Sequence, residues 1–276
     1  MVTIGYRMAM LVSGGLALIM AATIGWRMTY LIMAALIIIE VFVTFWAPEP
    51  EIAVTPPTTL AAAVINPLKE FLTRPAAIAI LIFILLYKLS DALALALGTT
   101  FLIRGVGFDL VQVGTTYKTV AIGASLLGAF MGGLWMTRLG LYRSLMGFGI
   151  LQGVSNLAFV VLAVVGKNYW LMVNVVFIEN FCGGLGNVAF VALLMTLCDL
   201  RYSATQFALF SAFSAVARVF VGPLAALMVL RLGWADFYVV SCLMMLPSLV
   251  LLWWLRGEVH SAQEVYKMAR GPKAAL

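Results

Sequence analysis

The sequence predicts an all-α polytopic membrane protein with about eight transmembrane helices. Hydrophobic residues make up 64% of the 276-residue chain and charged residues only 10%, so there is too little polar surface to cover a soluble core of this size. The apolar runs are continuous and do not alternate with a period of two, which favours helices over a barrel. A window of about 19 residues predicts spans at residues 4–24, 28–46, 76–103, 111–136, 145–165, 169–197, 205–230 and 237–255.

The basic residues of the loops predict the orientation of these spans. With Met1 in the cytoplasm, nine Lys or Arg residues fall in the inner loops and tail and only four in the outer loops. Cytoplasmic loops carry such an excess, so both termini are expected to be cytoplasmic. The formal net charge of +6 is then explained by the membrane, and no nucleic-acid partner is expected.

Residues 47–75 are predicted to form a cytoplasmic linker. The stretch begins "APEPEIAVTPP", whose prolines require an extended backbone. Leu60, Val64, Leu68 and Phe71 then recur at helical spacing, which predicts an interfacial helix along the inner membrane face.

An internal repeat divides the chain into two bundles. Residues 15–30, "GLALIMAATIGWRMTY", align without a gap with residues 223–238, "PLAALMVLRLGWADFY", and parallel repeats of this kind are typical of transporters. The offset of 208 residues would place the counterpart of residue 76 about 130 residues before Met1, so four helices of the first bundle are expected to be missing. The predicted domains are residues 1–46 (the last two helices of the first bundle), 47–75 (linker), 76–256 (a second bundle of six) and 257–276 (cytoplasmic tail).

Two bundles of six helices joined by a long cytoplasmic connection resemble the plan of the major facilitator superfamily. The loop "GGLWMTRLGLYRS" is similar to that superfamily's G-x-x-x-D-R-x-G-R motif. Gly133, Arg138, Gly140 and Arg143 match, whereas Thr137 replaces the motif's acid. The ion-pair latch that the motif implies would therefore lack its carboxylate.

Four segments resemble the AmpG family of muropeptide permeases more closely. They read "GYRMAMLVSGGLAL", "YKLSDALALALGTTFLIRGVGFD", "FIENFCGGLGNVAFVALLMTLC" and "SATQFALFSAFSAVARVFVGP". The resemblance implies a transporter of the bacterial inner membrane that imports anhydromuropeptides (GlcNAc-anhydroMurNAc peptides) by proton symport, for peptidoglycan recycling and β-lactamase induction. The alternatives are a related carrier for another sugar, peptide or acyl-coenzyme anion, and a fragment that is inactive by itself.

The charges within the third predicted span are the main candidates for a site. Residues 78–97 contain about a dozen Ile, Leu and Phe, worth roughly −4 to −7 kcal/mol of insertion, while Lys88 and Asp91 cost about +5 to +7 kcal/mol. Because the two terms nearly cancel, both charges are expected to face an interior cavity. At a spacing of i, i+3 they can pair with each other. A structural ion pair and a substrate or proton site remain equal alternatives.

Polar residues in other spans extend this candidate pathway. Glu179 is a second candidate proton carrier, or else an acid held by a neighbouring base. Arg218 suits a peptide carboxylate, or a structural partner for an acid. The predicted substrate or proton pathway comprises Lys88, Asp91, Lys118, Glu179, Asn180, Asn187 and Arg218. Residues predicted to serve helix packing or gating are Gly14, Gly15, Gly133, Arg138, Gly183, Gly184, Gly186 and Pro223.

No enzyme activity, metal or cofactor is expected. The chain has one histidine, His260, and contains neither H-E-x-x-H nor G-x-S-x-G. Gly184, Gly186 and Ala189 imitate a dinucleotide fingerprint, but no strand precedes them. The expected partners are protons, a muropeptide and the lipid bilayer, and the sequence leaves the oligomeric state open.

Overall fold

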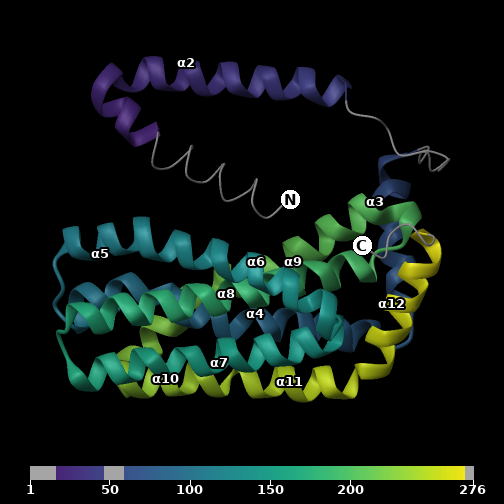
Figure 1. Cartoon of the computed structure of the whole chain (residues 1–276). Coiled ribbons are helices and arrows are strands. Elements are labelled where there is room, and N and C mark those ends of the chain that lie inside the picture. Colours follow the sequence, from purple (N-terminus) through teal and green to yellow (C-terminus); the bar gives the residue numbers. More distant parts are fainter. Residues whose placement is uncertain (1–16, 47–58, 271–276) are drawn as a thin grey trace. The chain divides into compact units, whose positions relative to one another are not determined.

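The computed structural model describes residues 17–46 and 59–270, and every regular element in these two ranges is helical (Figure 1). The chain divides into two compact units, Met1–Pro56 and Pro57–Leu276. The division falls within the predicted linker. Each unit is described by itself.

The described part of the first unit is the helix α2 (Ala17–Trp46). Its backbone leaves helical geometry at Gly25, which has φ 81° and ψ 159°. A candidate membrane span, Ile24–Trp46, includes this glycine near its start. The first predicted span, residues 4–24, lies mostly outside the described residues.

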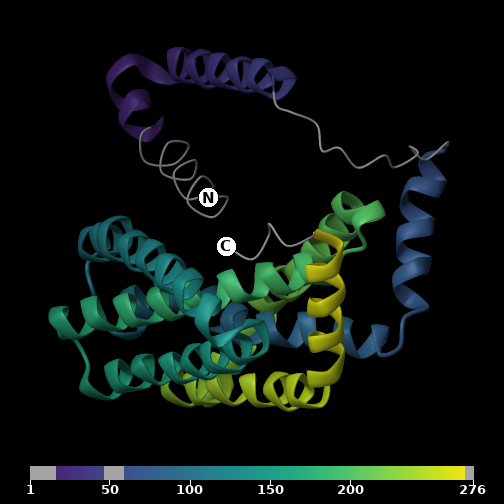
Figure 2. The same cartoon turned by 45° about the vertical axis from the view of Figure 1, so that its right-hand side comes forward.

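The second unit is built from α-helices, two short π-helical segments and one 3-10 turn. Its elements are α3 (Leu60–Leu72), α4 (Ala77–Thr100), η2 (Phe101–Gly105), α5 (Leu110–Thr116), η3 (Tyr117–Ala121), α6 (Ile122–Leu139), α7 (Leu141–Val165), α8 (Tyr169–Leu197), η4 (Leu200–Tyr202), α9 (Ser203–Leu232), α10 (Trp234–Leu243), α11 (Met245–Trp254) and α12 (Arg256–Arg270). Figures 1 and 2 show the long helices running along one common direction, with α3 and α12 crossing them at one end.

Seven helices in the described part of the chain are long and apolar enough to cross a membrane. They correspond to the second through eighth predicted spans, so the prediction of an all-α polytopic membrane protein is confirmed. The last of them, Trp234–Trp254, differs from the prediction in one respect. It is broken between α10 and α11 at Met244, because Pro247 lacks the N–H that would bond back to Leu243 and its ring clashes with that turn.

Single glycines join several of these helices. Gly140 separates α6 from α7 with φ 79° and ψ 164°, and Gly233 separates α9 from α10 with φ 82° and ψ 175°. This combination of positive φ and extended ψ is essentially restricted to glycine. Gly25 and Gly233 are aligned positions of the internal repeat, and they adopt the same backbone conformation. Gly140, which lies outside the repeat, has a similar conformation, so the repeat itself stays a prediction.

Small residues also determine how closely α6 and α8 approach each other. A Cβ added to Gly128 would collide with the backbone of Phe181, and one added to Gly132 would lie 3.1 Å from the Cα atom of Leu185. Glycine stripes of this kind allow the backbones of membrane helices to approach closely.

The substitution Gly140→Ala is expected to lower the free energy of unfolding by about 1–3 kcal/mol, because alanine is strained at positive φ with extended ψ. Thermal unfolding in detergent measures the effect. Gly147→Ala is the matched control, since Gly147 lies within α7 and a Cβ there meets nothing within 4 Å. Equal melting temperatures for the two variants would contradict the prediction.

Candidate functional site

A small polar cavity lies between α4 and α9. It has a volume of about 170 Å³ and is lined by Lys88, Asp91, Ala92, Leu95, Ala96, Ser214 and Arg218. Three of the predicted pathway residues, Lys88, Asp91 and Arg218, therefore share one cavity although Arg218 is far from the others in sequence. All three come from candidate membrane spans, where charged residues normally face the protein interior or a water-filled space.

Lys88 is buried, with 8% of its surface exposed. Its Nζ donates a hydrogen bond of 3.2 Å to Oδ1 of Asn187 on α8, and it lies 4.8 Å from the centroid of the Phe190 ring. An amide oxygen and an aromatic face both stabilise a cation that has left water. The structure thus brings together two predicted residues, Lys88 and Asn187, while the pairing of Lys88 with Asp91 stays a prediction.

Arg218 is exposed and Asp91 is partly exposed. Two cations and one acid line the cavity between α4 and α9, which gives it a net positive charge. A guanidinium group binds carboxylates through two parallel hydrogen bonds, so the cavity is suited to an anionic group.

Glu179 belongs to a second polar cluster, between α8 and α6. Its side chain is buried, with 5% exposed, and its Oε2 accepts a hydrogen bond of 2.7 Å from Nδ2 of Asn180. Oδ1 of Asn180 in turn accepts a hydrogen bond from the hydroxyl of Ser125 on α6. Glu179 and Asn180 do not line the cavity between α4 and α9.

Lys118 lies in the π-helical segment η3, a local geometry that is frequent at functional sites.

The predicted packing and gating residues occupy different environments. A Cβ on Gly184 would lie 2.5 Å from the carbonyl oxygen of Ser125, and one on Gly186 would collide with the side chain of Gln152. Backbone atoms of α6 leave no room for a side chain at Gly184, whereas the group beside Gly186 is the end of a flexible side chain that can move. Gly183 and Gly133 have no such neighbour.

The remaining predicted residues of this group are at the surface or outside the described ranges. Arg138 is exposed in the last turn of α6. Pro223 is exposed and lies within α9, which continues through it. Gly14 and Gly15 lie outside the described residues.

A buried polar cluster that the sequence did not indicate joins α4, α7 and α10. Ser90 donates a hydrogen bond of 2.8 Å to the carbonyl oxygen of Ser241, and Nδ2 of Asn156 lies 3.0 Å from the Ser241 hydroxyl. All three residues are at most 2% exposed. Small polar residues commonly join membrane helices in this way. Each of these helices contributes isolated polar residues to the cluster, so no periodic pattern marks the cluster in the sequence.

Comparison with known proteins defines the class of this membrane protein. Residues 1–220 match the family model described as "Major Facilitator Superfamily". The chain therefore belongs to this superfamily of membrane transport proteins.

Individual relatives are more specific. The chain is 52% identical over 250 residues to the protein named "Anhydromuropeptide permease" of Escherichia coli strain K12, covering 90% of this chain and 51% of that protein. It is 31% identical over 263 residues to "Putative transporter AmpG 4" of Rickettsia conorii, covering 93% of this chain and 63% of the relative. The chain thus spans about half the length of the Escherichia coli relative, and the similarity supports the resemblance inferred from the sequence.

Replacing Asn187 by Leu is expected to lower the free energy of unfolding by about 1–3 kcal/mol, because the buried Lys88 ammonium loses a hydrogen-bond acceptor. Thermal unfolding in detergent measures this loss. Asn174→Leu is the control on the same helix, since Asn174 is exposed and, among the described residues, its side chain hydrogen-bonds to the Trp170 carbonyl alone. The hydrogen bond would be energetically unimportant if both variants melted at the temperature of the parent chain.

Proposed function

We propose that this chain forms part of a proton-coupled importer of anhydromuropeptides in a bacterial inner membrane, with both termini in the cytoplasm, and that it is not an enzyme. The observation that carries the proposal is the 52% identity to the protein named "Anhydromuropeptide permease" over 90% of this chain. The orientation rests on the excess of Lys and Arg in the predicted inner loops.

The charges that line the polar cavity favour the binding of a negatively charged solute. Muropeptides carry peptide carboxylates, and the cavity provides the guanidinium of Arg218 and the ammonium of Lys88 beside the single acid Asp91. Arg218 can bind a carboxylate through two hydrogen bonds, whereas Lys88 is already oriented by Asn187. We propose that Arg218 receives the anionic group of the solute.

Proton coupling requires an acid that gains and loses a proton during the cycle. Asp91 lines the cavity beside the two cations, so a bound carboxylate would change the electrostatic environment of Asp91 directly. Glu179 is buried in the membrane-spanning bundle and bonds to Asn180 and not to a cation in the described contacts. We propose both as candidate proton carriers, with Asp91 closer to the solute.

A chimera tests the proposed function. In it, this chain replaces the matching 250 residues of the Escherichia coli relative, and the chimera is produced in a strain that lacks its own permease. Cytoplasmic accumulation of labelled anhydromuropeptide is expected to approach that of the parent permease. The 276-residue chain by itself is measured in parallel and is expected to give no uptake. A well-expressed chimera without uptake would contradict the assignment of the substrate.

Within this chimera, Asp91→Asn is expected to reduce uptake at least about tenfold while membrane expression stays near the parent level, because the cavity loses its titratable acid. Uptake over a range of external pH is the measurement. Normal expression and full-rate transport by the double variant Lys88→Met, Asp91→Leu would show that this charge pair is dispensable.

A further inference from the structure

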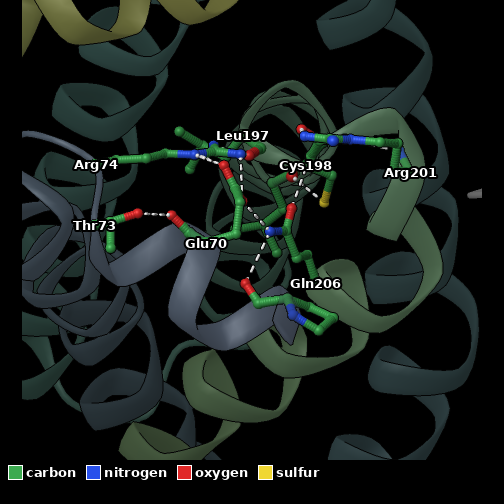
Figure 3. Close-up of polar contacts among 10 residues, drawn as sticks. Glu70, Thr73, Arg74, Leu197, Cys198, Arg201 and Gln206 are labelled. Atoms are coloured by element: carbon green, nitrogen blue, oxygen red, sulfur yellow. Dashed lines mark hydrogen bonds and ion pairs between the residues drawn. The ribbon is translucent and has the colours of Figure 1, made fainter. Parts of the chain in front are cut away.

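A polar cluster binds the linker helix α3 to the membrane helices at one end of the second unit (Figure 3). The Glu70 carboxylate accepts two hydrogen bonds of 2.9 Å from the Arg74 guanidinium. Arg74 also donates a hydrogen bond of 2.6 Å to the carbonyl oxygen of Leu197, and Glu70 accepts one of 2.6 Å from Nε2 of Gln206. We call Glu70, Arg74 and Gln206 the clasp.

Gln206 lies at the centre of the clasp and is only 1% exposed. Its Nε2 donates to the Pro67 carbonyl at 3.0 Å as well as to Glu70. Its Oε1 accepts a hydrogen bond of 2.7 Å from the backbone N–H of Asp199. The amide group of Gln206 is therefore satisfied on both sides only while α3 is docked, because two of its three partners belong to α3.

Arg74 caps the C-terminal end of α8, although Arg74 is not part of that helix. Leu197 is the last residue of α8, and the last carbonyl groups of a helix have no partner within it. The guanidinium of Arg74 satisfies this carbonyl and lies at the negative end of the helix dipole. On the apolar side, the rings of Phe71 and Phe210 pack edge to face with centroids 4.7 Å apart, and both are almost fully buried.

Both helices that line the polar cavity begin at the clasp. Helix α4 starts two residues after Pro75, beyond Ala76, which has a strained positive φ of 60°. Helix α9 starts at Ser203 and carries Gln206 in its first turn. Along α9, Gln206, Phe210, Ser214 and Arg218 recur every four residues, so one ridge of this helix connects the clasp to the cavity.

We propose that the clasp is a conformational latch: while α3 is docked, it holds the starts of α4 and α9 and the end of α8 together, and release of α3 lets the cavity between α4 and α9 widen. The proposal deepens the proposed transport function, since it concerns the same cavity. Opening of the latch can nevertheless be measured without any solute. A result against the latch can therefore be distinguished from a result against the proposed transport function.

The natural Cys198 reports on the docking of α3. Its side chain is partly buried, and it lines a surface pocket of about 550 Å³ together with Glu70, Arg74 and Arg201. Burial raises the pKa of the Cys198 thiol to about 11, and the positive charge of Arg74 acts in the opposite direction. Loss of the Arg74 charge alone would therefore slow the reaction of this thiol with a maleimide, whereas undocking of α3 would accelerate it.

The experiment compares maleimide labelling of the purified 276-residue chain with that of the variant Arg74→Gln. Labelling is quantified at Cys198 by mass spectrometry. A second reporter, Ala92→Cys, is introduced into both proteins, because Ala92 lines the cavity and is only 6% exposed. Arg74→Gln is expected to accelerate labelling at both positions by about tenfold, as loss of a charged hydrogen bond implies.

Two controls make each outcome decisive. Arg201→Gln removes an arginine from the same pocket. Among the described residues, the side chain of Arg201 hydrogen-bonds to Asp199 and to no residue of α3, so labelling is expected to stay at the parent rate. Ala94→Cys reports unfolding, because Ala94 is 2% exposed and does not line the cavity, and it is expected to remain unreactive.

Three results would contradict the proposal that the clasp is a latch. Unchanged labelling of Cys198 in Arg74→Gln would show that the clasp does not hold α3. Faster labelling of Cys198 without a change at Ala92→Cys would show that docking of α3 is not coupled to the cavity. Labelling of Ala94→Cys in the Arg74→Gln background would show that the clasp only supports the fold.

Discussion

A charged or polar group inside a lipid bilayer has lost its water, and it is tolerated only where other groups of the protein replace that water. Much of the arrangement of the second unit follows from this constraint. The ammonium of Lys88 meets an amide oxygen and an aromatic face, and the carboxylate of Glu179 meets the amide of Asn180. Ser90, Asn156 and Ser241 satisfy one another between three helices. The polar groups therefore specify which helices become neighbours.

These polar contacts also require the helices to approach each other closely, because side-chain hydrogen bonds are short. The glycines of α6 and α8 allow this approach, since they leave room for the backbone of one helix to contact the backbone of the other. Gly184 in particular lies against the carbonyl of Ser125, whose hydroxyl bonds to Asn180. Small residues and polar residues on the same pair of helices thus act together, and the same helix α8 carries both Glu179 and the acceptor for Lys88. Helix α8 therefore connects the polar cluster around Glu179 with the hydrogen bond to Lys88.

Most features that depend on local sequence were predictable. Hydropathy predicted the seven spans of the described residues within a few residues. Gly25 and Gly233, which the sequence alignment pairs, both join helical segments with positive φ and extended ψ. The break at Met244 follows from Pro247, whose effect on the helix does not show in mean hydropathy. For the candidate site, Lys88, Asp91 and Arg218 were recognised as charges within apolar runs, whereas Gln206 and the Ser90 cluster were not, since uncharged polar residues barely change the mean hydropathy of a helix.

Hydropathy and composition are enough to establish an all-helical membrane protein and to identify the residues that are too costly to face lipid. These are properties of each segment alone, because transfer from water to lipid depends on the composition of the segment. Which polar groups contact each other becomes known only from the packed bundle. Lys88 bonds to a residue 99 positions away and Gln206 to one 139 positions away. Such pairings depend on how helices pack in three dimensions, and the period of a helix specifies the face of a residue but not its partner across the bundle.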